Sequence, residues 1–391
     1  MNTFLSATYV LPATGEPIKD GVIEVEDDGT IRGIYPPNSE ALAGKPIRNH
    51  VGIITPGFVN THCHLELSHM KGVVPKRTGL ISFLQQVMAH RATDEADIIR
   101  AMEEADNALY NNGVVAVGDH ANTGVSASVK KDSRLYYHTF VEVLGFEPEL
   151  AESKLAAALD VAGQFDRATT SITAHAPYSV SKELFKRIDE EAYKRRMPMS
   201  IHNQECEAEN QFFRYKEGPF LGFYEALGKD ISDFKAQARN SLHTVIPYLS
   251  VDTPVLLVHN TFTTAKDLFF VERQGRDATW CFCPNANLYI EGTLPRVPHF
   301  VQYGRTITLG TDSLASNDHL CVLSELKTLH QHFPELPLTE TIKWATVNGA
   351  RFLGIADRFG TLECGKAPGI NLLTHTRGLA LTADSEVVRL V

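Results

Sequence analysis

The strongest constraint on the fold is an alternation between short β-type runs and helical runs along most of the chain. Eight β-type runs lie at 53–64, 114–120, 135–145, 171–178, 197–202, 255–260, 279–284 and 306–312. Segments with helical periodicity separate them. Eight consecutive β/α units are typical of a (β/α)8 TIM barrel, so we expect an α/β fold of that class. A doubly wound open sheet is the alternative, but no glycine-rich phosphate turn follows an early strand, which disfavours it.

The two ends of the chain are also β-rich, although each is too short to enclose a core of its own. Residues 1–54 contain apolar runs separated by turn residues, and the apolar run 370–374 follows a Pro-Gly turn. Because so short a segment buries little apolar surface alone, we expect the two ends to join. We therefore predict a small β-sandwich from residues 1–54 and 362–391, with the barrel in residues 55–361.

Charge and apolar content exclude several classes of partner. The 391 residues carry 37 basic and 47 acidic side chains, a net charge of −10. Because no lysine- or arginine-rich run occurs, we expect no nucleic-acid partner. No apolar run approaches the ~20 residues needed to cross a bilayer, and no basic region typical of a signal peptide begins the chain. With six cysteines and no CxxC pair, we expect a cytoplasmic protein with reduced thiols.

Metal-binding side chains stand where several of the predicted strands end. The first strand ends in His62 and His64, which alternate along the strand and therefore point to the same side. The fifth strand ends in His202, and the eighth ends in Asp312. In a barrel these ends meet at one face. Three imidazoles and one carboxylate suffice for a zinc or iron site that keeps a position for water.

Together with nearby residues, these motifs resemble the amidohydrolase superfamily, in the branch of metal-dependent deaminases of aminated heterocycles and related chlorohydrolases. The resemblance is carried by Pro56-Gly-Phe-Val-Asn-Thr-His-Cys-His64, His202-Asn-Gln-Glu205, His259-Asn260 and Gly310-Thr-Asp312. It implies that the metal ligands are His62, His64, His202 and Asp312. It also implies that Glu205, His259 and Asp312 are catalytic and handle protons.

The resemblance also bears on the number of metal ions. Binuclear members of the superfamily carry a lysine at the end of the fourth strand, whereas strand 171–178 contains none. We therefore expect one divalent metal ion, with Zn2+ as the first choice and Fe2+ as the alternative.

Three residues are predicted to contact the substrate. His175 begins a His-Ala-Pro-Tyr motif at the position where similar deaminases carry a substrate-contacting histidine. His120 ends the second strand, and a hydrogen-bonded structural role is its alternative. Arg214 is a candidate for binding a carboxylate or sugar, and an exposed helical arginine is its alternative.

The resemblance implies a hydrolytic deaminase of a purine-, pyrimidine- or pterin-like base or nucleoside. In such an enzyme, metal-bound hydroxide attacks the amino-bearing ring carbon and ammonia leaves. Glu205 favours this activity over dechlorination, because chloride leaves without being protonated. The alternatives are a dechlorinase or cyclic-amide hydrolase of the same fold and, more distantly, a metal-free non-catalytic paralogue. Homo-oligomers are common among such barrel enzymes, so a homo-oligomer is possible by analogy, although the sequence does not determine the oligomeric state.

Overall fold

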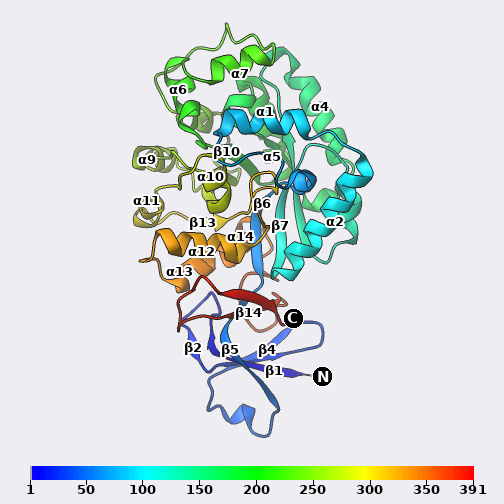
Figure 1. Ribbon diagram of the computed structural model, residues 1–391, viewed down its shortest axis with the longest axis vertical. Coiled ribbons are helices and arrows are strands. Elements are labelled where there is room, and N and C mark those ends of the chain that lie inside the picture. Colours follow the sequence, from blue (N-terminus) through cyan, green and yellow to red (C-terminus); the bar gives the residue numbers. More distant parts are fainter. Residues whose placement is uncertain (1) are drawn as a thin grey trace.

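The computed structural model describes residues 2–391 as an α/β part and a β-sheet built from both chain ends (Figure 1). The α/β part contains two parallel four-stranded sheets, and every predicted β-run overlaps one of their strands. The first sheet comprises β6 (Phe58–Cys63), β7 (Val114–Ala121), β8 (Tyr136–Val143) and β9 (Thr170–Ala174). The second comprises β10 (Met199–Asn203), β11 (Val255–His259), β12 (Thr279–Phe282) and β13 (Ile307–Leu309). The expected α/β class with parallel strands is confirmed.

Hydrogen bonds link the outer strands of one sheet to those of the other. Between β9 and β10, the amide of His202 donates to the carbonyl of His175 at 2.9 Å. Between β13 and β6, the amides of Thr311 and Asp312 donate to the carbonyl of His62 at 3.0 and 3.1 Å. Because these bonds lie at the carboxyl ends of the strands, they fix the relative positions of several predicted site residues.

Helices connect the strands and surround them in Figure 1. They are α1 (Leu80–His90), α2 (Glu95–Asn111), α3 (Ala127–Asp132), α4 (Ala151–Ala162), α5 (Lys182–Arg195), α6 (Glu207–Tyr215), α7 (Phe220–Ala226), α8 (Ser241–Val245), α9 (Ala265–Arg273), α10 (Pro284–Ile290), α11 (Val297–Gln302), α12 (Val322–His332), α13 (Leu338–Trp344) and α14 (Val347–Phe352). In α5, for example, Phe185 and Ile188 are buried, and the Ser181 side chain caps the first turn. None of the helices within residues 2–391 combines the length and apolar composition needed to cross a bilayer.

The two ends of the chain form one seven-stranded sheet with the order β15-β14-β5-β1-β3-β4, in which β2 pairs with β1. Its strands are β1 (Thr3–Val10), β2 (Ile18–Lys19), β3 (Val22–Val25), β4 (Ile31–Tyr35), β5 (Ile47–Pro56), β14 (Ile370–Thr374) and β15 (Glu386–Arg389). Since β14 pairs with β5, the C-terminal segment completes a sheet begun by the N-terminal one.

The predicted strand 53–64 is divided between the two parts of the molecule. The strand β5 ends one residue before Gly57, and β6 begins one residue after it. The amide of Gly57 donates to the carbonyl of Pro368 at 3.2 Å, and a Cβ at this position would lie 2.2 Å from Val115 Cγ1. Glycine therefore permits the close approach at which the chain passes from one sheet to the other.

A second apolar cluster lies apart from the main core and shapes the region around the strand ends. It includes Phe83 and Val87 of α1, Phe212 of α6, and Phe223 and Tyr224 of α7. Because several of these side chains line the same cavity as the polar residues at the strand ends, the cluster forms an apolar wall beside those residues.

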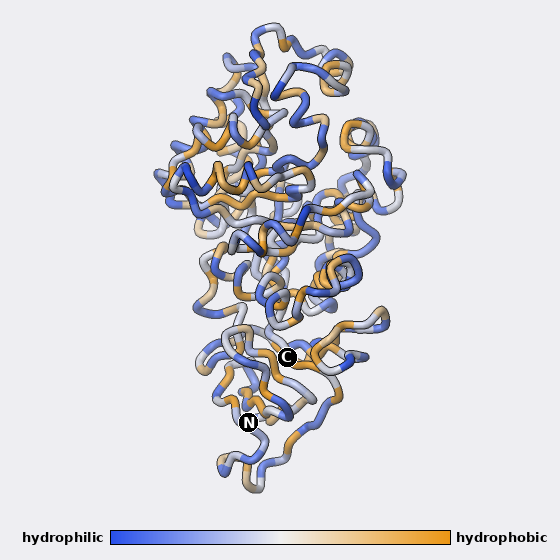
Figure 2. The backbone as a smooth tube through the Cα atoms, turned by 90° about the vertical axis from the view of Figure 1, so that its left-hand side faces the viewer, coloured by the Kyte–Doolittle hydropathy of each residue, from blue (hydrophilic) through white to orange (hydrophobic). Residues whose placement is uncertain are grey.

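Hydrophobic and hydrophilic stretches alternate along the chain in both parts of the molecule (Figure 2).

Candidate metal centre

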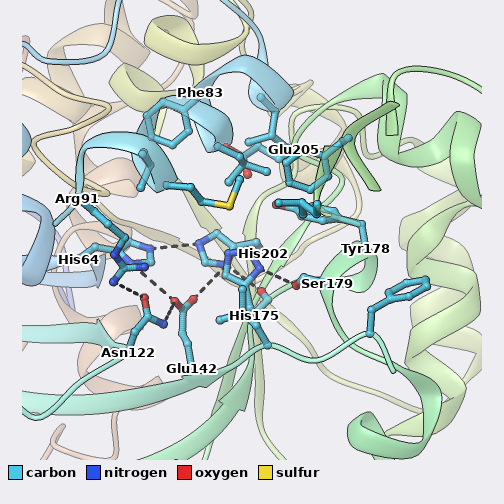
Figure 3. A pocket seen from close by; sticks show the side chains of 18 of the residues that line it. His64, Phe83, Arg91, Asn122, Glu142, His175, Tyr178, Ser179, His202 and Glu205 are labelled. Atoms are coloured by element: carbon cyan, nitrogen blue, oxygen red, sulfur yellow. Dashed lines mark hydrogen bonds and ion pairs between the residues drawn. The ribbon is translucent and has the colours of Figure 1, made fainter. Parts of the chain in front are cut away.

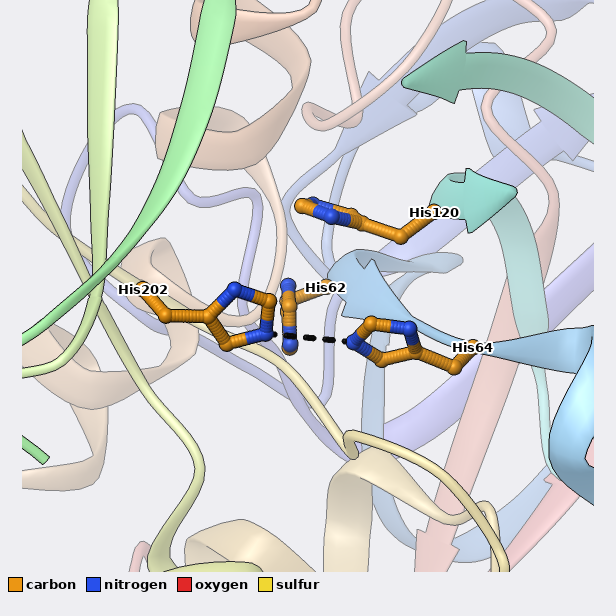
Figure 4. A group of neighbouring side chains, drawn as sticks. All are labelled: His62, His64, His120 and His202. Carbon is orange, nitrogen blue, oxygen red and sulfur yellow. Dashed lines mark hydrogen bonds between the residues drawn. The ribbon is translucent and has the colours of Figure 1, made fainter. Parts of the chain in front are cut away.

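The imidazoles of His62, His64 and His202 converge at the carboxyl ends of β6 and β10 (Figure 4). The Nε2 atoms of His64 and His202 are 3.2 Å apart, and the centroid of the His62 ring lies 4.9 Å from each of the other two. Asp312, which follows β13, places Oδ1 3.6 Å from Nε2 of both His62 and His64. The structure therefore brings together the four residues predicted to bind the metal.

The pattern of donors and acceptors in this cluster fits a bound cation. His62 is fully buried, and neither of its ring nitrogens has a hydrogen-bond partner. Burial lowers the pKa of His62, His64 and His202, which favours the neutral form that binds metals. His202 Nδ1 lies 2.8 Å from the carbonyl of His175, which only accepts, so Nε2 of His202 bears a lone pair. Nitrogen and carboxylate ligands suit a divalent ion, which makes the cluster a candidate divalent-metal site.

Strained backbone conformations position two of the site residues, Asp312 and His259. Asp312 and His259 have φ values of 56° and 72°, in the left-handed region that side chains other than glycine seldom adopt. Such conformations cost on the order of 1–3 kcal/mol each and persist where the surroundings enforce them. Ser316 Oγ donates to Oδ2 of Asp312 at 2.6 Å, which leaves Oδ1 facing the imidazoles.

Glu205 lies in the loop after β10 and is buried beside the cluster. Its Oε1 is 3.8 Å from Nε2 of His259. Burial and then the charge of Asp312 raise the pKa of Glu205 well above its ordinary value, while burial lowers the pKa of His259 to about 3. A carboxyl group whose pKa burial raises therefore faces an imidazole that burial keeps neutral.

Glu142, at the end of β8, is a further polar residue of this region to which sequence reasoning assigned no role. Its Oε1 lies 2.8 Å from Nδ1 of His120, and its Oε2 accepts from Asn122 Nδ2 at 3.1 Å. Burial raises the pKa of Glu142, but the neighbouring imidazoles, that of His175 first, outweigh it and hold this pKa well below its usual range. The sequence signal that could have identified Glu142 was its place near the end of the predicted strand 135–145.

A cavity of about 280 Å³ opens above the cluster (Figure 3). The polar residues His64, His175, His202, Glu205, His259 and Asp312 line it on one side. The apolar lining comes largely from α1 and from α7 with the residue after it, and includes Leu80, Phe83, Leu84, Val87, Met88, Phe223, Tyr224 and Leu227. His175, predicted to contact the substrate, thus lies in the cavity wall, with Nδ1 2.7 Å from Ser179 Oγ.

The other two residues predicted to contact the substrate do not line this cavity. His120 is buried and bonded on both sides, through Nδ1 to Glu142 and through Nε2 to Ser200 Oγ, each at 2.8 Å. Arg214 on α6 donates from Nε to Asn240 Oδ1 at 2.6 Å. The structural alternative describes His120, whose two ring nitrogens are used inside the protein. Arg214 is half-buried rather than exposed and also pairs with Glu207 Oε1 at 3.1 Å. A substrate contact by either residue stays a prediction.

Comparison with known proteins identifies the family. Residues 53–388 match the model of the amidohydrolase family. The chain is 25% identical over 371 residues to adenosine deaminase of Helicobacter pylori, covering 93% of this chain and 87% of that protein. It is 25% identical over 351 residues to aminodeoxyfutalosine deaminase of a Nitratiruptor species, covering 85% and 81%. The protein belongs to the amidohydrolase family and is a hydrolase acting on carbon–nitrogen bonds other than peptide bonds.

A solved structure shares the fold over the full length of both chains. Aminofutalosine deaminase of Helicobacter pylori, in complex with methylthio-coformycin, superimposes with a TM-score of 0.83 at 22% identity and 100% coverage of each chain. This likeness confirms the α/β amidohydrolase fold.

A buried carboxyl group holds the loop that carries Glu205. Oε1 of Glu209 accepts from the amide of Gln204 at 3.1 Å, and its Oε2 accepts from the amide of Glu205 at 3.3 Å. Burial raises the pKa of Glu209 from 4.5 to about 7. The folded protein therefore keeps a proton that the unfolded chain releases, and this stabilisation is full below pH 4.5 and lost as the pH rises through 7.

Glu209→Gln is expected to remove this pH dependence. Between pH 4.5 and 7 the free energy of unfolding of the wild type should fall by on the order of 3 kcal/mol relative to that of the variant. Urea unfolding at a series of pH values measures the difference. Glu207→Gln, at a more exposed position, serves as the control. A constant difference between wild type and Glu209→Gln would contradict the assignment.

Proposed function

We propose that this protein is a metal-dependent hydrolytic deaminase of an aminated heterocycle, namely a purine-, pyrimidine- or pterin-like base or nucleoside. The observation that carries the proposal is the buried Glu205 carboxyl, with its raised pKa, in the cavity beside the imidazole cluster. Hydrolytic deamination needs a proton on the ring nitrogen and another on the leaving amino group. Relatives named as deaminases of adenosine and aminodeoxyfutalosine support the same activity.

The metal site proposed for this activity consists of His62, His64, His202 and Asp312. Three nitrogens and one carboxylate oxygen suit a single Zn2+, with Fe2+ as the alternative. When bound, such an ion lowers the pKa of a water molecule and stabilises developing negative charge. The unpartnered nitrogens of His62 support this ligand set, and the absence of lysine from β9 supports a single ion.

The residues around the cluster are assigned to proton transfer. A water oxygen bonds to the amino-bearing ring carbon, and Glu205 donates a proton to the adjacent ring nitrogen. Asp312, an anion at the start, takes one proton from the water and passes it to the amino group, the carbon–nitrogen bond breaks, and the other proton of the water restores the Glu205 carboxyl. His259, 3.8 Å from Glu205, polarises the incoming water. One water and one amino group thus yield a ring carbonyl and ammonia.

The cavity suggests what the substrate carries besides its ring. The Arg91 guanidinium donates to Asn122 Oδ1 at 3.3 Å, and among residues 2–391 no ion pair of this guanidinium with a carboxylate is found. The lining is mostly apolar along α1 and α7. We assign to the substrate an apolar substituent with a hydrogen-bond-accepting or anionic group that reaches Arg91. His175, whose Nδ1 is occupied by Ser179, would contact the substrate through Nε2.

We also propose a closed (β/α)8 barrel in residues 55–361 and a β-sandwich from residues 1–54 and 362–391. The hydrogen bonds between β9 and β10 and between β13 and β6 support closure of the barrel. A small molecule is the proposed partner, without nucleic acid or membrane, and a homo-oligomer stays a prediction. The six cysteines are free, which supports the proposal of a cytoplasmic protein.

Ammonia release by zinc-loaded protein tests the proposal. The substrates are adenosine, 5′-deoxyadenosine, aminodeoxyfutalosine, guanine, cytosine and an aminopterin, with a chlorotriazine and a cyclic amide as controls. Ammonia from an aminated ring is the expected result. Turnover of a control alone would replace the proposal with a dechlorinase or cyclic-amide hydrolase. A chain that binds no metal and turns over nothing would be a non-catalytic paralogue.

Glu205→Gln is expected to lower kcat by about 10²- to 10⁴-fold, because the amide cannot transfer the proton. Zinc content and the urea unfolding midpoint should stay close to those of the wild type, since the side chains have similar volumes. Glu207→Gln, at the nearby start of α6, is the matched control and should keep full activity. Full activity of Glu205→Gln would refute its role in proton transfer.

Arg91→Met is expected to change substrate preference. Loss of a charge-assisted hydrogen bond should lower kcat/KM for adenosine 5′-carboxylate by roughly 10- to 100-fold, with a much smaller effect on uncharged 5′-deoxyadenosine. Lys154→Met, at an exposed position of the cavity rim, is the control for loss of a positive charge. Equal losses for both nucleosides in Arg91→Met would contradict the assignment.

A further inference from the structure

One buried carboxylate that the proposed reaction does not use faces several imidazoles of the cluster. Glu142 Oε1 lies 2.8 Å from His120 Nδ1 and 3.4 Å from His202 Nδ1. Its Oε2 lies 3.9 Å from His64 Nδ1 and accepts from Asn122 Nδ2 at 3.1 Å. Figure 3 shows Glu142 beneath His64 and His202, among the residues that line the cavity. A single side chain is therefore directed at the Nδ1 atoms of three rings.

This arrangement determines which nitrogen of each ring bears a lone pair. A nitrogen that faces a carboxylate is favoured as the donor, so the hydrogen lies on Nδ1 and the lone pair on Nε2. In His64 and His202, Nε2 is the atom that points into the candidate metal centre. The ring of His120 packs against that of His62 with centroids 4.5 Å apart. Glu142 thus acts on two ligand rings directly and on a third through His120.

Coordination of a second cation is the competing explanation, because Glu142, His175 and His202 also lie close together. The Nδ1 atoms of both rings are occupied, however. His202 Nδ1 donates to the carbonyl of His175 at 2.8 Å, and His175 Nδ1 bonds to Ser179 Oγ at 2.7 Å. Since His202 Nε2 points into the candidate metal centre, only His175 Nε2 and the Glu142 carboxylate are left for a second cation, which favours a role in orientation over coordination.

We propose that Glu142 is a positioning residue of the metal centre. It favours the Nδ1–H tautomer of His64 and, together with the His175 carbonyl, that of His202, it holds the orientation of both rings, and it adds a negative charge beside the bound cation. It contacts neither the cation nor the reacting atoms. The proposal rests on the ligand set given under the proposed function, but it does not depend on which heterocycle is the substrate.

Zinc affinity of Glu142→Gln tests the proposal. Glutamine keeps the shape of the side chain but removes the charge and one of the two acceptor oxygens. We expect one zinc per chain in both proteins and an about 10- to 100-fold weaker zinc affinity in the variant, measured by competition with a chromophoric chelator. The visible absorption spectrum of the cobalt(II)-loaded protein should also change, because the ligand rings are no longer held in one orientation.

Asp106→Asn is the matched control. Asp106 is a buried carboxylate on α2 that accepts from Ser133 Oγ at 2.6 Å and from the Tyr137 hydroxyl at 2.8 Å, outside the cluster. Its replacement should lower the unfolding midpoint of the metal-free protein and leave zinc affinity unchanged. If Glu142→Gln does not fold, Glu142→Asp replaces it, because the shorter side chain should weaken zinc binding although the charge remains.

Two results would overturn the role of Glu142. The first is unchanged zinc affinity together with an unchanged cobalt spectrum in a folded variant. The second is a wild type that binds two zinc ions, one of which Glu142→Gln loses, because Glu142 would then be a ligand. A wild type that binds no zinc would instead overturn the ligand set on which both this proposal and the proposed function rest.

Discussion

The burial of imidazoles and carboxylates together at the carboxyl ends of the strands is the constraint on which the rest of the site depends. A buried polar atom without a partner costs about 1–3 kcal/mol, so these groups need one another or a cation. His62, with both ring nitrogens unpartnered, shows that the protein alone does not satisfy them. The parallel strands provide the frame, and the strained backbone at Asp312 directs a carboxylate toward the same point.

Within this buried region, neighbouring groups shift the pKa values of chemically similar carboxyl groups in opposite directions. Burial alone raises the pKa of each, but Asp312 and Glu142 face imidazoles that lower it below the ordinary value. Glu205 has carboxylates as its charged neighbours, Asp312 first, and its pKa is raised further. Carboxyl groups whose pKa values are shifted in opposite directions are the combination that acid–base catalysis uses.

Much of this site follows from the sequence, because a parallel strand of known direction fixes which residues lie at its carboxyl end. That rule brought together residues far apart in the chain, namely His62, His64, His202, His259 and Asp312. Glu142 also lies at the end of a strand, but its role could not be predicted, since that role depends on lateral contacts among neighbouring strands, which a linear pattern does not specify. Arg214 is bonded to Asn240, and no spacing argument reveals such a partner. The change of sheet at Gly57 depends likewise on contacts with residues distant in sequence.

The imidazole cluster and Asp312 are proposed to form a single metal centre at the floor of the cavity. A crystal structure of the zinc-loaded protein, with anomalous diffraction data collected on both sides of the zinc absorption edge, would locate the ion. A single centre at this place gives one strong anomalous peak per chain, enclosed by Nε2 of His62, His64 and His202 and by Oδ1 of Asp312. A peak between Glu142 and His175, or no peak in the cluster, would contradict it.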